Sequence, residues 1–450
     1  MSLLSAGINP ISPISPLAGN IPNIAKMGEL IVEIPSAIPS LSGLEVLRSS
    51  TFKAKPPLPP PPPPRPIYPL ANATTTNHTM GASLTRYLAI KVHQAVLAQS
   101  YNRIIITGAY NRYSSRSIPF TLEKTDKPFN WERPTARHDV QTNTLYIECF
   151  PGLDHLSHYA EIIATYLALL SREDLTPPSA VCYIPTSPSD TQLALREGTN
   201  LADFPGEGVH TVILGLVWHL PSLVGSDEWS PGQGESAPWQ WVIKTFPSSS
   251  PSPNNTRSEK KKNPRTVAFL GFRPAFWGCI SGEVIHFLGA RFRSIKEVIY
   301  LGKLGTLDPN LQPNRWLATG SSSILHDGQH QTGAVVQWKS VLDDAVERKG
   351  KDCTAVGRHI TLGSVLHETK EWWEKMHGRA DFVDPEIGMM AQAAVRCGLG
   401  FGYLHMVTDN LGKKYEEDLS NEREEGVLKG RERLHRVVEE VIGDYVRSGC

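Results

Sequence analysis

Short apolar runs bounded by glycine, proline or acidic residues recur along most of this chain, with segments of helical periodicity between them. Three such runs are RIIITGAY (residues 103–110), TVAFLGF (266–272) and GFGYLHMVTD (400–409), and two helical segments are residues 82–99 and 155–173. Buried runs rich in Val and Ile that alternate with helices are typical of a sheet covered on both faces. We therefore predict an α/β fold with a mixed, mostly parallel sheet flanked by helices.

Two low-complexity stretches divide the chain. Residues 1–80 are rich in Pro and Ser and include KPPLPPPPPPRP (55–66), which favours polyproline II because proline lacks the backbone N–H. A second stretch, PSSSPSPNNTRSEKKKNP (247–264), has too little apolar surface to order itself. We predict a disordered tail over residues 1–80 and a single α/β catalytic domain over 81–450, with a disordered insertion at about 247–264.

Composition narrows the class of protein. The 450 residues include 45 Lys+Arg and 45 Asp+Glu, so overall charge favours neither a polyanion nor a polycation as partner. The six cysteines are far apart without a CxxC pair, which argues against a zinc ribbon or a disulfide framework and favours a reducing compartment. The sequence lacks a basic leader with an apolar core and a run of about 18 apolar residues. We expect a cytoplasmic protein without a membrane partner.

Nucleotide-binding and metal-binding motifs are absent from the sequence. It contains no GxxxxGK[ST] and no GxGxxG, so we predict no cofactor, and it contains no GxSxG, so there is no acyl-serine signature. His155 and His158 are spaced like metal ligands but lack a matching acidic residue, so we predict no metal site.

Two carboxylates flank one helix-strand unit in VDPEIGMMAQAAVRCGLGFGYLHMVTDN (383–410). Glu386 stands in the first turn of the predicted helix, where the helix dipole favours a negative charge. Asp409 follows an apolar strand, at the sheet edge where α/β proteins hold ligands. Each position is also common for a purely structural carboxylate. If both face one site, their different environments suit a division of acid-base roles.

This unit resembles the C-terminal signature of the purine nucleoside phosphorylase and nucleosidase superfamily. Two further blocks are similar to that family, EVIYLGKLGTLDPNLQPNRWLATGS (297–321) and HITLGSVLHETKEW (359–372). The resemblance implies a nucleoside-phosphorylase-like fold in the second half. It also implies that Glu386 binds ribose hydroxyls and that Asp409 protonates the departing purine base.

A separate acidic cluster lies in AVVQWKSVLDDAVERKG (334–350), which we interpret as an amphipathic helix. Asp343, Asp344 and Glu347 lie on its polar side at i,i+3 and i,i+4 spacing. Like charges this close raise one another's proton affinity, so one carboxylate could act as a general base or the group could bind a cation. The structural alternative is a solvated helix face.

The DDxxE pattern formed by Asp343, Asp344 and Glu347 is similar to that of fungal arginine-containing cyclodipeptide synthases. The resemblance implies that these three residues are catalytic. It implies that arginine from Arg-tRNA is joined to the amino acid of a second aminoacyl-tRNA, giving a cyclo-(Arg-Xaa) diketopiperazine of secondary metabolism. This is the first functional hypothesis, with aminoacyl-tRNAs as partners. Cleavage of a purine nucleoside by Glu386 and Asp409 is the alternative.

Overall fold

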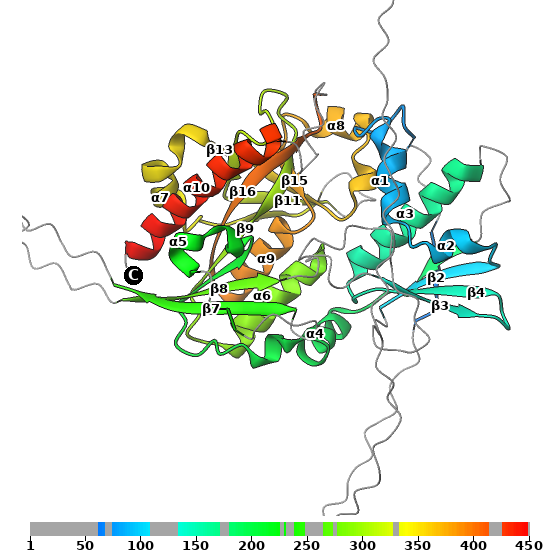
Figure 1. Cartoon of the computed structure of the whole chain (residues 1–450), viewed down its shortest axis with the longest axis horizontal. Helices are drawn as coiled ribbons and strands as arrows, with labels where there is room; N and C mark the ends of the chain where they lie inside the picture. The colour runs from blue at the N-terminus through cyan, green and yellow to red at the C-terminus, as the bar shows by residue number, and fades with distance from the viewer. Residues whose placement is uncertain are drawn as a thin grey trace, which may run out of the picture. The chain divides into compact units, whose positions relative to one another are not determined.

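Two β-sheets, each packed against helices, organise the computed structural model of this protein (Figure 1). The structure describes residues 62–67, 74–108, 134–171, 180–225, 229–230, 238–247, 264–272, 277–326, 333–413 and 425–448. All of them belong to one compact unit, Pro60–Cys450.

The smaller sheet has the strand order β1-β5-β2-β4-β3. Its central strand β2 is parallel to β4 and β5, and the apolar run predicted at 103–110 supplies this strand. Helices α1 and α3 pack on the sheet and on each other, and they bury the side chains of Ile104 and Ile106. The elements are β1 (Arg65–Pro66), α1 (Ser83–Lys91), α2 (Ala95–Ala98), β2 (Arg103–Thr107), β3 (Thr135–Asp139), β4 (Thr144–Glu148), α3 (Leu153–Ser171) and β5 (Ala180–Tyr183).

The larger sheet contains 11 strands. Its path runs β12-β11-β14-β15-β9-β16-β10-β13, and β6, β8 and β7 join it at β9. Six of the ten pairings among these described strands are parallel and four are antiparallel. The predicted α/β class with a mixed, mostly parallel sheet is therefore confirmed. The strands are β6 (Thr211–Gly215), β7 (Trp239–Phe246), β8 (Arg265–Phe272), β9 (Glu297–Thr306), β10 (Leu317–Thr319), β11 (Ser322–His326), β12 (Val335–Gln337), β13 (Thr354–Val356), β14 (His359–Leu362), β15 (Phe382–Asp384) and β16 (Gly400–Asn410).

Helices cover both faces of the larger sheet because residues of its central strands alternate between two cores. Tyr300 on β9 and Tyr403 on β16 are buried in the same core as helices α6 (Cys279–Arg291) and α9 (Ile387–Cys397). Leu301 and Leu404, the next residues along each strand, are buried with α7 (Asp343–Lys349) and α10 (Glu425–Arg447). The remaining helices are α4 (Pro188–Glu197), η2 (Asn200–Asp203), η3 (Val217–His219), α5 (Pro221–Val224), η4 (Lys351–Cys353), η5 (Val365–His367) and α8 (Lys370–Met376).

The two sheets are joined through the start of α6. Asp154 on α3 accepts a hydrogen bond from the backbone N–H of Cys279, with 2.9 Å between N and Oδ2. Trp277, just before α6, stacks on His158 of α3 at 4.3 Å between ring centroids, and its indole N–H donates to the Gly363 carbonyl. The smaller sheet therefore fixes the position of the α6 N-terminus.

One predicted helix is wrong over its first half. Residues 334–350 were expected to form a single amphipathic helix, but Val335–Gln337 is strand β12, antiparallel to β11, and the helix α7 is confined to Asp343–Lys349. Val335 and Val336 are β-branched, and such side chains favour strands because the helix restricts their rotamers.

The predicted tail and insertion lie mostly outside the described residues. The structure does describe part of the segment before residue 80. Arg65–Pro66 pairs with β5, and His78 is buried and bridges to Thr369. The ordered fold thus begins before the predicted boundary.

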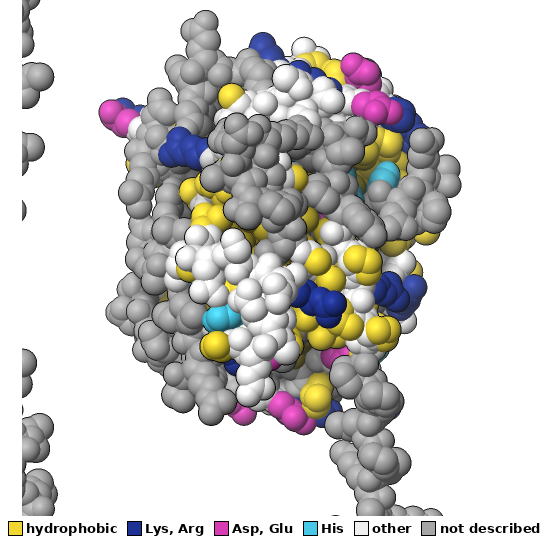
Figure 2. Space-filling model, turned by 90° about the vertical axis from the view of Figure 1, so that its right-hand side faces the viewer, with side chains coloured by type: hydrophobic (Ala, Val, Ile, Leu, Met, Phe, Trp, Pro, Cys, Tyr) yellow, Lys and Arg dark blue, Asp and Glu magenta, His cyan; other side chains and the backbone are white. Residues whose placement is uncertain are grey.

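Residues 248–263 are not described, and β7 and β8 on either side of them pair antiparallel. None of the described helices is both long and apolar enough to cross a membrane. Figure 2 shows the side of the molecule formed by the smaller sheet, where acidic and basic side chains are interspersed with apolar ones.

Candidate active site

The start of helix α9 is built around Asp384, the last residue of β15. Its Oδ1 accepts hydrogen bonds from the backbone N–H groups of Glu386 and Ile387, each at 2.9 Å. These are among the N–H groups that a helix leaves without a partner in its first turn, and a carboxylate there also complements the helix dipole. Glu386 itself makes no side-chain cap, although it is the N-cap residue. Asp384 therefore satisfies the helix terminus and leaves the Glu386 side chain available for another role.

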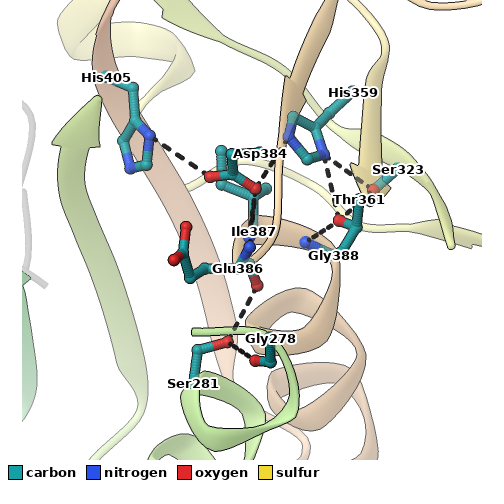
Figure 3. A network of polar contacts seen from close by, with 10 residues as sticks. All are labelled: Gly278, Ser281, Ser323, His359, Thr361, Asp384, Glu386, Ile387, Gly388 and His405. Atoms are coloured by element: carbon teal, nitrogen blue, oxygen red, sulfur yellow. Dashed lines mark hydrogen bonds and ion pairs between the residues drawn. The ribbon is translucent and has the colours of Figure 1, made fainter. Parts of the chain in front are cut away.

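Two buried histidines accompany Asp384 (Figure 3). His359 Nε2 on β14 lies 3.0 Å from Oδ1, and His405 Nδ1 on β16 lies 3.7 Å from Oδ2. His359 Nδ1 is also 2.9 Å from the hydroxyl of Ser323. Burial disfavours the charged form of Asp384, but the neighbouring His359 outweighs it and holds the pKa of this carboxyl below its usual range. The arrangement is a buried carboxylate that stays ionised.

The Glu386 carboxyl group is directed away from Asp384, on the side where His405 lies (Figure 3). As a residue Glu386 is half-buried, and its backbone carbonyl accepts a hydrogen bond from Ser281 of α6 at 3.2 Å. Burial, and then the negative charge of Asp384, raise the pKa of Glu386 well above its usual range. Glu386 is therefore a neutral carboxylic acid at pH values where an ordinary glutamate is ionised.

Asp409 lies near the carboxyl end of β16 and is exposed, after a register shift between Val407 and Asp409. Its Oδ2 accepts a hydrogen bond from the Thr408 hydroxyl at 2.8 Å. Glu368, in the segment after η5, is influenced by the same carboxylate. Burial and then the charge of Asp409 raise the pKa of Glu368 to about 8. This end of the sheet thus carries a carboxyl group that retains its proton at neutral pH.

Glu386 and Asp409 belong to chain segments on opposite sides of the same strand. Val383 of β15 and Asp409 of β16 both pair with Gly305 of β9, from its two edges. Two strand spacings separate such positions by about 10 Å. Glu386 follows Val383 by three residues.

The acidic cluster of α7 lies at the other end of β16. Ser340, shortly before α7, bridges to Phe401, the second residue of β16. Eight residues of extended strand, from Phe401 to Asp409, span about 26 Å. Asp343, Asp344 and Glu347 are all exposed, and Glu347 forms a salt bridge with Lys351. The structure therefore does not bring the DDxxE residues together with Glu386 and Asp409.

Sequence reasoning missed four residues of this site. Asp384, His359, His405 and Glu368 meet their partners through pairing of distant strands and loops, which no local spacing reveals. One signal was present for the histidines. Each histidine lies in a mostly apolar strand, in RHITLGS and YLHMVT, and a buried polar group of that kind requires a partner.

No group of three or more His, Cys, Asp or Glu side chains in the described part of the chain could hold a metal ion. The two histidines with metal-like spacing have other contacts. His155 Nδ1 lies 3.1 Å from the Phe150 carbonyl oxygen, and His158 Nδ1 lies 2.8 Å from the Ser364 hydroxyl.

Comparison with known proteins finds a distant likeness of fold alone. No family model matches the chain, and no curated protein matches it. Among solved structures, 5'-methylthioadenosine/S-adenosyl homocysteine nucleosidase of Campylobacter jejuni is 13% identical with a TM-score of 0.39, covering 52% of this chain and 98% of that one. A futalosine hydrolase mutant of Helicobacter pylori is 15% identical with a TM-score of 0.38, covering 52% and 100%. The 5'-methylthioadenosine nucleosidase of Arabidopsis thaliana is 14% identical with a TM-score of 0.38, covering 53% and 96%.

Proposed function

We propose that this protein cleaves the N-glycosidic bond of a purine nucleoside at the edge of the larger sheet where β16 ends. The observation that carries the proposal is the carboxyl pair Glu368 and Asp409. The pKa of Glu368 is raised to about 8, first by burial and then by Asp409. A purine leaves more readily when it is protonated, and a general acid works best when its pKa lies near the working pH.

Glu386 would hold the sugar. A neutral carboxylic acid has one O–H donor and retains acceptor capacity, so it can accept from one hydroxyl and donate to the next. This matches two adjacent hydroxyls of ribose. The backbone of Glu386 is held by Asp384 and Ser281, so its position is set before a ligand arrives.

The proposed step breaks the bond between C1' of the ribose and the ring nitrogen of the base. The electron pair of that bond goes to the base, which receives a proton from the Glu368 and Asp409 pair. Water adds its oxygen to C1' and returns a proton to the pair, so the products are free base and ribose. Phosphate in place of water would give ribose 1-phosphate.

A substrate panel tests this proposal. Purified protein is incubated with adenosine, inosine, guanosine and 5'-methylthioadenosine, with and without phosphate, and free base is measured by liquid chromatography. We expect release of at least one base, and the effect of phosphate identifies the co-substrate. Absence of release from the whole panel would overturn the proposal.

We propose tRNA-dependent synthesis of a cyclo-(Arg-Xaa) dipeptide as a second candidate, supported by a different observation. Asp343 and Asp344 are exposed at the start of α7, and neither forms a salt bridge within the described residues. Such carboxylates are suited to an arginyl guanidinium or an attacking amine. Supplying arginine, tRNA, synthetases and amino acids and searching for cyclo-(Arg-Xaa) by mass spectrometry tests it. Product formation that is unchanged in Glu347→Gln would show that the cluster is only a solvated face.

A further inference from the structure

The buried carboxyl group of Asp384 connects three strands of the larger sheet. It ends β15, it accepts two backbone N–H groups of the α9 start, and it contacts the imidazoles of His359 on β14 and His405 on β16 (Figure 3). The exposed fraction of Asp384 is 5%, and that of each histidine is 0%. A carboxylate buried this deeply persists only when it is paired and hydrogen-bonded.

The position of Asp384 relative to Glu386 has a specific electrostatic consequence. Only Pro385 separates the two residues, and the Asp384 carboxylate binds the backbone N–H of Glu386 itself. Burial is the main factor that disfavours a negative charge on Glu386, and the fixed negative charge of Asp384 disfavours it further. The titratable groups around Glu386 are Asp384, Tyr300 on β9 and His405 on β16. Burial lowers the pKa of His405 to about 4, so this imidazole is neutral at pH 7 and adds no positive charge.

We infer that Asp384 is a positioning residue that ties the start of α9 to β14 and β16 and keeps Glu386 available for an uncharged, hydroxyl-bearing ligand instead of a cationic one. The identity of that ligand as a vicinal diol rests on the proposed function. The role of Asp384 in holding the Glu386 backbone and keeping its carboxyl group neutral does not depend on the proposed function.

The first test measures the protonation of Glu386 without any substrate. The carboxylic acid signal of Glu386 is isolated as the infrared difference between wild type and Glu386→Gln, and it is followed as a function of pH. In Asp384→Asn the amide oxygen can still accept the two backbone N–H groups, but the charge is gone. We expect the titration midpoint of Glu386 to fall by about 1 pH unit or more in this variant.

Asp381→Asn is the matched control. Asp381 also accepts a backbone N–H, from Arg358 at 2.7 Å, and lies three residues earlier in the chain, but it is not among the groups that raise the pKa of Glu386. The titration midpoint of Glu386 in Asp381→Asn should equal that in wild type. A midpoint unchanged in Asp384→Asn would overturn the inference. If Asp384→Asn does not fold, the titration of Glu386 in wild type still tests the inference. A Glu386 that titrates as an ordinary glutamate would also refute it.

The second test addresses the ligand. Adenosine and arginine amide are titrated into wild type and Glu386→Gln by calorimetry. We expect adenosine to bind and Glu386→Gln to weaken it about 10-fold or more, as for loss of a hydrogen bond that leaves a polar group unpaired. Binding of arginine amide that depends on Glu386 would overturn the ligand assignment. If neither probe binds, the ligand assignment and the proposed function both fail, while the infrared result still decides the role of Asp384.

Discussion

Asp384 and Glu386 are two residues apart, yet their carboxyl groups are driven to opposite protonation states. Asp384 has two backbone N–H donors and a histidine within 3.0 Å, which favour the anion. Burial and then the negative charge of Asp384 raise the pKa of Glu386, and its side chain makes no cap bond, so the acid form is favoured. Pairs of carboxyl groups whose environments separate their pKa values are typical of sites that divide acid and base roles.

The raised pKa of Glu368 predicts a pH-dependent stability. Its folded-state pKa of about 8 lies above the ordinary value of 4.5. The folded protein therefore binds this proton more tightly than the unfolded chain, and the stabilisation is full below about pH 4.5 and is lost as the pH rises towards 8. Between pH 5 and pH 8.5 we expect the free energy of unfolding of wild type to fall by at least about 1 kcal/mol more than that of Glu368→Gln.

Urea unfolding at the two pH values measures this difference. Glu374→Gln, which changes an exposed glutamate on α8, serves as the control. Its stability should change with pH as that of wild type does. Parallel pH dependence in wild type and Glu368→Gln would show that Glu368 is an ordinary carboxylate.

At the residue scale, sequence reasoning could locate what local pattern determines. The helix after Glu386 and the strand ending near Asp409 were predicted, and the structure has α9 at Ile387–Cys397 and β16 at Gly400–Asn410. The protonation state of Glu386 could not be predicted, because it depends on a sheet register that joins β15, β9 and β16 across long stretches of sequence.

At the scale of elements, α9 is held against the sheet by close contacts at its first turn. The backbone N–H of Gly388 donates to Thr361 Oγ1 of β14 at 2.8 Å. A Cβ at Gly388 would lie 2.3 Å from that oxygen and 2.6 Å from the Ser323 hydroxyl. We expect Gly388→Ala to destabilise the fold by about 1–3 kcal/mol through this overlap.

Gly426 provides a matched comparison, because it also lies in the first turn of a helix, α10, and a Cβ there would meet no atom within 4 Å. Gly426→Ala should be neutral or stabilise by up to about 1 kcal/mol, since alanine favours the helix. Chemical unfolding of both variants measures the contrast. Equal changes in stability at the two positions would contradict the close packing of α9 against the sheet.

The incorrect helix at 334–350 shows what local pattern could not decide. Leu342, Ala345 and Val346 are buried against α10, so the apolar stripe was real for the last part of the segment. In the first part, Val335–Gln337 pairs with β11 instead. A short apolar run fits either period, and the availability of an edge strand at β11 determined the outcome.

At the scale of the molecule, the strand order interleaves the two halves of the sequence. β6 lies between β8 and β9, and β7 pairs with β8. If a protease site is inserted at residue 256 and cleaved, the fragment with β6 and β7 keeps hydrogen bonds to strands of the other fragment. We expect the two fragments to co-elute in size-exclusion chromatography with the circular dichroism of the intact protein. Fragments that separate as stable folded halves would contradict a single domain.

The two functional hypotheses place their chemistry at opposite ends of β16. Ser340, just before the DDxxE helix, bridges to Phe401 at its start, and Asp409 lies near its end. The effects of variants in the two clusters can therefore be measured independently, because substitutions at sites this far apart with no shared partner have additive effects.

In the proposed reaction, a carboxyl pair at the end of β16 protonates the departing purine base. The most direct measurement is the rate of base release from the best nucleoside of the panel by wild type, Asp409→Asn and Glu347→Gln. We expect Asp409→Asn to slow release by about 100-fold or more, while Glu347→Gln, which changes an exposed carboxylate at the far end of the strand, stays within about two-fold of wild type. An Asp409→Asn variant as fast as wild type, or a Glu347→Gln variant as slow as Asp409→Asn, would contradict it.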